Sequence, residues 1–129
     1  MLSCCRGYAG KCKLDYFGDI SMDREKKPFP LPERLRVIRK ARGISQVQLG
    51  IMAGIEKSTA SARMNQYEKG KHAPDWSTLS SIAQVLNVPE SYFYVVDDLE
   101  AELLLRIYFF TDDEKRRVLA FVDNDAKQT

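Results

Sequence analysis

Two amides and two lysines stand close together near the middle of this 129-residue chain, in the stretch ARMNQYEKGKHAP. An Asn or Gln side chain carries both a donor and an acceptor, so it can pair bidentately with adenine in the DNA major groove. Lysine supplies positive charge for phosphates and carries no sequence information. Asn65 and Gln66, followed by Lys69 and Lys71, therefore indicate a surface that binds a polyanion.

The helix expected to carry these amides has two distinct faces. Ala60, Met64 and Tyr67 recur at spacings of four and three, which predicts a buried face. Ser58 is expected to be the N-cap, and Gly70 ends the helix after Lys69. At 100° per residue the opposite face carries Ser58, Ala62, Asn65 and Lys69, with Ser61 and Gln66 on its shoulders.

The rest of the pattern from residue 31 onward is also helical. We expect helices at about 32–42, 46–53, 75–86, 98–110 and 112–123, with a short helix in VPESYFYVV. Ser45 is a candidate N-cap for the second helix, and Thr111 with Glu114 forms a capping box for the last. The tail after residue 123 is expected to fray.

Residues 1–30 read as an N-terminal arm with little regular structure. KCKLDYF gives a weak strand signal, which fits a short hairpin, an extended arm or disorder. The only cysteines are Cys4, Cys5 and Cys12, and an odd count argues against a disulfide framework. With His72 as the single histidine, a metal ligand set is missing, and we expect no metal and no cofactor.

Composition excludes several classes of protein. No apolar run approaches the roughly 18–20 residues needed to cross a bilayer, and the N-terminus lacks a secretory signal, so we expect a cytoplasmic protein with no membrane partner. The chain has no nucleophile arrangement at informative spacing and no Gly-rich phosphate loop. We therefore expect neither an enzyme nor a small-molecule substrate.

The net charge of +2 hides a strong asymmetry. Residues 31–74 hold nine bases and three acids, whereas residues 75–129 hold five bases and eleven acids. The two segments therefore carry +6 and −6. A basic lobe is a hint of a nucleic-acid face, although basic helices are also common solvated surfaces.

Two short helices joined by a tight turn, the second rich in amides, form a helix-turn-helix pattern. The chain from about 33 to 95 resembles the Xre family, the lambda-repressor and Cro-like regulators. The matching residues are Arg39, Gly43, Ser45, Gln46, Leu49, Ala53, Gly54, Glu68, Gly70, Pro74, Leu79, Ile82, Ala83, Leu86, Val88 and Pro89. The resemblance implies a mainly α fold: five short helices that bind operator DNA, usually as a two-fold dimer.

We accordingly divide the chain into an arm at 1–30, a DNA-binding domain at 31–95 and a C-terminal helical segment at 96–129. The resemblance also implies residue roles. The residues expected to read base edges are Ser58, Ser61, Ala62, Asn65 and Gln66. The residues expected to contact the DNA backbone are Gln46, Arg63, Lys69 and Lys71. Gln46 is also expected to brace the recognition helix, which carries Asn65 and Gln66. Arg63 matches a half-buried position, and Arg39 with Glu68 matches a structural ion pair.

The chain departs from the family pattern in two places. Between Ile55 and Glu68 it is about four residues longer, which either extends the recognition helix at its N-terminus or lengthens the turn at 55–58. Val47, Ile51 and Met52 place an apolar strip where the family is usually polar. Residues 1–30 or a second subunit could cover this strip, or it is a harmless exposed patch.

The two C-terminal helices resemble a dimerisation unit appended to such a domain. Their apolar positions would pack against a second copy or against the fifth helix; they are Leu103, Ile107, Phe110, Leu119 and Val122. The sequence thus predicts a sequence-specific DNA-binding regulator, a repressor, acting as a homodimer on a pseudo-palindromic operator. The alternative is an antitoxin-like or adaptor module that binds protein, with DNA binding secondary.

Overall fold

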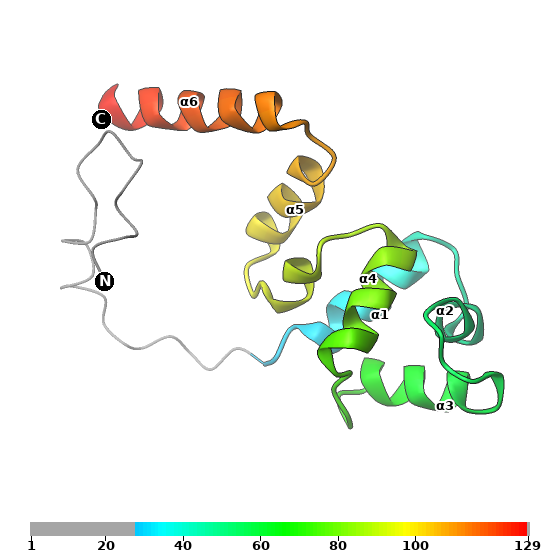
Figure 1. Ribbon diagram of the computed structural model, residues 1–129. Coiled ribbons are helices and arrows are strands. Elements are labelled where there is room, and N and C mark those ends of the chain that lie inside the picture. Colours follow the sequence, from blue (N-terminus) through cyan, green and yellow to red (C-terminus); the bar gives the residue numbers. More distant parts are fainter. Residues whose placement is uncertain (1–27, 129) are drawn as a thin grey trace. The chain divides into compact units, whose positions relative to one another are not determined.

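The computed structural model of the chain describes residues 28–128, and within this range all regular secondary structure is helical (Figure 1). The helices are α1 (Leu31–Ala41), α2 (Gln46–Met52), α3 (Lys57–Glu68), α4 (Trp76–Leu86), the 3-10 helix η3 (Glu90–Tyr94), α5 (Asp98–Ile107) and α6 (Asp112–Gln128). The predicted mainly α fold is confirmed. The expectations for the arm and its cysteines fall on residues outside the described range, apart from residues 28–30.

The described helices belong to two compact units. One unit contains α1 to α5 and ends at Phe110, and the other contains α6. The predicted capping box begins α6: Thr111 Oγ1 accepts from the Glu114 N–H at 3.3 Å, and the Thr111 N–H donates to the Glu114 carboxylate at 2.7 Å. The hydrogen bonds from Thr111 lower the pKa of Glu114 below its usual range.

Two local expectations are wrong, the start of α3 and the end of α6. Ser58 is not the N-cap of α3, because the helix begins at Lys57, two residues before the expected Thr59, with Glu56 at the N-cap position. The neighbouring Ile55 is buried. The short helix expected in VPESYFYVV is present as a 3-10 helix, whereas α6 continues to Gln128, beyond its predicted end at 123.

One core unites α1 to α5. Its fully buried side chains come from every helix of that unit, and the largest are Phe93, Leu31, Leu35, Leu49, Met64, Leu79, Ile82, Leu86 and Val88. The predicted buried face of α3 is confirmed, with Ala60 and Met64 fully buried and Tyr67 8% exposed. One side of α3 is therefore anchored in the core, which leaves the other side to face outward.

The two helices of the helix-turn-helix approach each other closely at Gly50. A Cβ atom built on Gly50 would lie only 2.7 Å from the Cβ of Ala60 on α3, well inside contact distance. Gly54, in the turn between the helices, has a φ of +88°, which L side chains rarely adopt. The two glycines thus allow α2 and α3 to pack face to face through a short turn.

Arg34 attaches the start of α5 to α1. Its guanidinium donates to the carbonyl oxygens of Val95 at 3.0 and 3.1 Å, and to those of Val96 and Asp97 at 3.2 Å. It also forms an ion pair with Asp98 at 3.0 Å. The first turn of α5 is therefore held by a side chain more than 60 residues away in the sequence.

Replacing Gly50 with alanine is expected to lower the free energy of unfolding by about 1–3 kcal/mol, because the new methyl group overlaps Ala60. Urea denaturation followed by circular dichroism measures the change. Val47→Ala, at a partly exposed position of the same helix, is the control and should stay within about 0.5 kcal/mol of the parent. A Gly50→Ala protein as stable as the parent would contradict this close approach.

Candidate nucleic-acid interface

The outward side of α3 forms a polar ridge, which we call the α3 ridge: Ser58, Ser61, Ala62, Asn65, Gln66 and Lys69. Ser58, Ser61, Ala62 and Lys69 are exposed, whereas Asn65 and Gln66 are half-buried in the second half of the helix. Lys71 lies just beyond and is also exposed. The helix thus presents hydroxyl and amide groups on the side opposite to Met64.

The extra residues before Glu68 lie in the helix and not in the turn. The connection between α2 and α3 covers only residues 53–56, and α3 has 12 residues. Since four residues make about one helical turn, lengthening at the N-terminus leaves the facial phase nearly unchanged. Ser58 therefore lies on the same side of α3 as Ala62 and Asn65.

Three helices meet at the carboxylate of Glu68. Arg39 of α1 binds it through Nε at 2.5 Å and Nη2 at 3.2 Å. Gln46 of α2 donates from Nε2 to the same carboxylate at 2.9 Å. The side chains of Arg39 and Glu68 are 11% and 5% exposed. The residues paired in the sequence analysis thus form an ion pair, and Gln46 adds a link to α2.

Arg39 also holds the turn that precedes α2. Its Nη1 donates to the carbonyl oxygen of Ile44 at 2.8 Å. At the start of α2, Ser45 accepts from the Gln48 N–H at 3.1 Å, and the Gln48 side chain accepts from the Ser45 N–H at 3.0 Å. This capping box fixes the first turn of α2, where Gln46 is located.

Part of the basic charge in residues 31–74 serves the fold and not a ligand. Arg34 and Arg39 are bound internally as described, and Arg42 donates from Nε to the carbonyl oxygen of Leu86 at 2.9 Å. The exposed bases near the α3 ridge are Lys57, Arg63, Lys69 and Lys71. Arg63 is exposed, in contrast to the half-buried position expected from the resemblance.

Two exposed residues were missed from the sequence. Lys57 lies in the first turn of α3, but the choice of Ser58 as N-cap excluded it from the helix. Trp76 is the first residue of α4 and is 65% exposed. Trp76 precedes the core residues Leu79 and Ala83 by three and seven positions, so helical spacing favours burial and gave no signal of its exposure.

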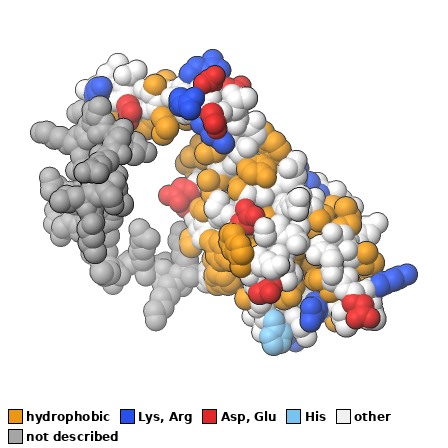
Figure 2. Space-filling view, viewed as in Figure 1, with side chains coloured by type: hydrophobic (Ala, Val, Ile, Leu, Met, Phe, Trp, Pro, Cys, Tyr) orange, Lys and Arg blue, Asp and Glu red, His pale blue; other side chains and the backbone are white. Residues whose placement is uncertain are grey.

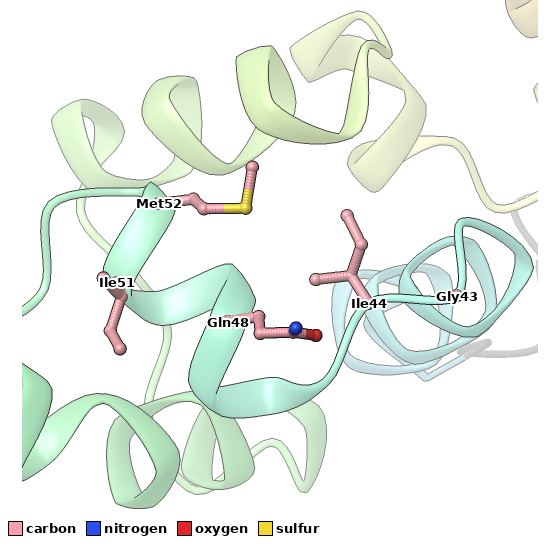
Figure 3. A pocket seen from close by; sticks show the side chains of 5 residues that line it. All are labelled: Gly43, Ile44, Gln48, Ile51 and Met52. Atoms are coloured by element: carbon pink, nitrogen blue, oxygen red, sulfur yellow. The ribbon is translucent and has the colours of Figure 1, made fainter.

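The apolar strip on α2 is exposed, with Val47, Ile51 and Met52 at 38%, 42% and 61%. Beside it lies a shallow pocket lined by Gly43, Ile44, Gln48, Ile51 and Met52. Figure 3 shows Met52 and Gln48 extending from α2 towards Ile44. This surface is apolar, unlike the α3 ridge.

The apolar positions of the C-terminal helices are also largely accessible. In α5, Ala101 is buried, whereas Leu103 is 53% exposed. Phe110 is exposed and Ile107 half-buried. In α6, considered by itself, Leu119 and Val122 are 49% and 56% exposed.

The described part of the chain contains no cluster of three or more His, Cys, Asp or Glu side chains arranged to hold a metal ion. None of the helices in that part combines the length and apolar character required of a membrane span.

The similarity to known proteins includes the segment that carries the α3 ridge. A helix-turn-helix domain family matches residues 31–91. Uncharacterized HTH-type transcriptional regulators of Sinorhizobium medicae (strain WSM419) and Rhizobium meliloti (strain 1021) are each 36% identical over 77 residues. That alignment covers 57% of this chain and 52% of each relative, so it spans about half the length of these curated proteins.

The fold and sequence also resemble a solved structure, that of the transcriptional regulator BswR. The identity is 40% and the TM-score 0.67, and the match covers 73% of this chain and 93% of the BswR chain. These similar proteins are transcriptional regulators and not enzymes, which confirms the expectation that the chain is not an enzyme.

Glu68→Ala is expected to lower the free energy of unfolding by about 3–5 kcal/mol, because it leaves the buried guanidinium of Arg39 without its partner. Thermal and urea unfolding provide the measurement. The control is Glu102→Ala, which removes an ion pair with Arg106 whose side chains are 55% and 71% exposed. That change should cost about 0.3–0.5 kcal/mol. Equal losses in the two variants would rule out a special role for Glu68.

Proposed function

We propose that this chain, which belongs to the helix-turn-helix family of DNA-binding transcriptional regulators, is a sequence-specific repressor of the Xre branch. It acts in the cytoplasm as a homodimer on a pseudo-palindromic operator in double-stranded DNA. It needs no cofactor for this activity.

The main support for the proposal is the α3 ridge, because it lies on a helix whose opposite side is buried in the core. A major groove about 12 Å wide admits one α-helix. Reading base edges requires that the helix hold its orientation while it lies there. The buried face around Met64 and the carboxylate of Glu68 meet that requirement.

The proposed contacts separate into two kinds. Asn65 and Gln66 read base edges with their amides, with Ser58, Ser61 and Ala62 as further base contacts along the same side of the helix. Lys69, Lys71 and Arg63 bind phosphates. Gln46 uses one Nε2 hydrogen for Glu68, so its second hydrogen remains available for a phosphate on DNA.

A dimer follows from the small size of the module. One α3 ridge contacts few base pairs, whereas two rigidly joined ridges read half-sites about one DNA turn apart. The apolar positions of α5, of the residues that follow it and of α6 offer surfaces for pairing, with Leu103, Ile107, Phe110, Leu119 and Val122 as the proposed contacts. Repression then requires only that the dimer occupy its operator.

Selection of bound duplexes from a random pool tests the function directly. We expect two inverted half-sites whose centres are separated by about 10 base pairs or a multiple of that spacing. A single unrepeated site would contradict the dimer. Failure to enrich any sequence would contradict sequence-specific binding.

The second candidate is an antitoxin-like or adaptor module, and the exposed α2 strip with its pocket favours it. Val47, Ile51 and Met52 would then bind a protein, and DNA binding would be secondary. Affinity capture from the native cell distinguishes the two functions. A stoichiometric protein partner that survives high salt and is lost in a Met52→Asp variant would favour the adaptor.

Asn65→Ala and Lys71→Ala should weaken DNA binding in different ways. Loss of the Asn65 amide is expected to cost about 1–3 kcal/mol on the operator and to relax the base preference at one position. Loss of the Lys71 charge should weaken all sequences alike and reduce the salt slope by about one. Fluorescence anisotropy on operator and scrambled duplexes at several salt concentrations measures both effects.

Gln84→Ala, which removes an exposed amide from α4, is the control for these variants and should leave affinity unchanged. If Asn65→Ala lost the same affinity on operator and scrambled DNA, its assignment to base reading would be wrong.

Leu103→Glu is expected to shift the protein from dimer to monomer, because it places a charge in an apolar contact between subunits. Sedimentation equilibrium measures the change. The control, Gln84→Glu, adds the same charge at an exposed position of α4. A Leu103→Glu protein that associates as strongly as the parent would remove α5 from the proposed interface.

A further inference from the structure

The last helix, α6, is amphipathic, and its apolar side is exposed. None of its 17 residues is buried. The large apolar side chains in the middle of the helix are 39% to 72% exposed, and we call them the α6 strip: Val118, Leu119, Phe121 and Val122. In proteins most of the stability of a helix comes from packing of its apolar side, so a partner for the α6 strip is expected.

The charged residues of α6 are arranged symmetrically about Ala120, with opposite signs. The pairs at equal distance before and after Ala120 are Arg117 with Asp123, Lys115 with Asp125, and Asp113 with Lys127. Each of these pairs combines a base with an acid. Figure 2 shows hydrophobic side chains along the middle of α6, at the top of the view, with basic and acidic side chains towards both ends.

The other positions of the helix fit the same symmetry. Asp112, Glu114 and Arg116 correspond to residues without charge, which are Gln128, Ala126 and Asn124. No pair of corresponding positions therefore carries like charges. The order of charges along α6 is complementary to the same order reversed.

An antiparallel pair of α6 helices from two copies of the chain brings the opposite charges to the same level. If the pair is centred at Ala120, Lys115 of one copy lies level with Asp125 of the other, and Arg117 lies level with Asp123. Because such a pair has two-fold symmetry, each contact occurs twice. A parallel pair would place every charged residue level with its own copy, so like charges would repel.

The α6 strip fits this antiparallel register. Val118 and Val122 are one turn apart on the same side of the helix, at equal distances from Ala120. Val118 of one copy therefore packs against Val122 of the other, and the reverse contact follows by symmetry. Ala120 itself points to the opposite side of the helix, away from the second copy.

The four charges nearest to the α6 strip are available for a second copy. In the described part of the chain the one ion pair of α6 joins Arg116 to Asp113 at 2.9 Å, and the carboxylate of Glu114 accepts from the Thr111 N–H. Neither contact uses the four inner charged residues, which are Lys115, Arg117, Asp123 and Asp125.

We propose that α6 binds α6 of a second copy in an antiparallel orientation, with the two-fold axis at the level of Ala120. This inference rests on the homodimer of the proposed function and specifies its orientation and register. The occupant of the α6 strip is a second copy of this chain, because the apolar residues and the charges around them are complementary to themselves.

Charge reversal in the full-length protein tests the pairing, measured by sedimentation equilibrium at low salt without DNA. The acidic variant carries Lys115→Glu with Arg117→Glu, and the basic variant carries Asp123→Lys with Asp125→Lys. Each variant alone places like charges level with each other, so its dimer dissociation constant should rise roughly ten- to hundredfold. An equimolar mixture restores the opposite charges and should form a heterodimer about as tightly as the parent.

The possible results separate the alternatives. Unchanged association of both variants would overturn the α6 pairing, since a parallel pair or a dimer held through α5 alone does not oppose these charges. A loss that the mixture does not restore would also overturn it, because the contact would then lie within one chain or with another protein. Neither result affects DNA binding by α3. Failure of the random duplex selection would overturn the proposed function and leave the pairing intact.

Two further substitutions test which side of α6 is in the contact. Val122→Glu should raise the dimer dissociation constant roughly tenfold or more, because it places a charge in the centre of the apolar contact. Ala120→Glu adds the same charge at an exposed position on the opposite side and should leave association unchanged. Equal effects of the two substitutions would contradict the assigned side.

The effect of net charge has its own control. Lys69→Glu with Lys71→Glu changes the charge by the same amount as the acidic variant, at exposed positions in and beyond the α3 ridge. This variant should associate like the parent in the absence of DNA. Circular dichroism checks that every variant keeps its helix content. A comparable loss of association in the Lys69→Glu and Lys71→Glu variant would contradict a specific contact through α6.

Discussion

The carboxylate of Glu68 is the point on which the rest of this structure depends. Arg39 from α1 and Gln46 from α2 both bind it, and the carboxylate is almost wholly removed from solvent. A buried charge of this kind is tolerated only while its partners are in place. Rotation of α3 about its axis would break both contacts together. The ion pair therefore fixes the direction in which Asn65 and Gln66 point, and the base reading that we propose depends on that direction.

Several basic residues also stabilise the fold. Arg34 and Arg42 donate to backbone carbonyls at the ends of other helices, so their charges help to hold the fold together. The bases left exposed beside α3 are mainly lysines, together with Arg63. Lysine binds phosphate as a point charge, whereas the planar arginine fork suits fixed hydrogen-bond geometry. This difference explains why arginines form the internal contacts and lysines make up most of the exposed bases of α3.

Three exposed surfaces of the chain differ in chemistry. The α3 ridge is polar and flanked by bases, the α2 strip is apolar beside a shallow pocket, and α5 exposes Leu103 while burying Ala101. A regulator that binds DNA and a second subunit needs the first and third surfaces. The α2 strip has no assigned role in that scheme, which is why the adaptor function is retained as the second candidate.

The sequence alone determined the features that arise between residues close together in the chain. The buried face of α3, the N-cap at Ser45 and the start of α6 at Thr111 follow from i, i+3 and i, i+4 spacing and from side chains that bond their own backbone. The resemblance added the pairing of Arg39 with Glu68. Even so, local reasoning placed the start of α3 two residues too late, because the helix begins at Lys57 without a side-chain cap.

Only the tertiary structure decided the contacts between distant residues. The approach of Gly50 to Ala60, the bond from Gln46 to Glu68 and the binding of Arg34 to the residues before α5 join segments 10 to more than 60 positions apart. The hydrophobic periodicity of the sequence does not predict such pairs, because each depends on how the packed helices bring their side chains together. The exposure of Trp76 is of the same kind, because it depends on how the core packs against the first turn of α4.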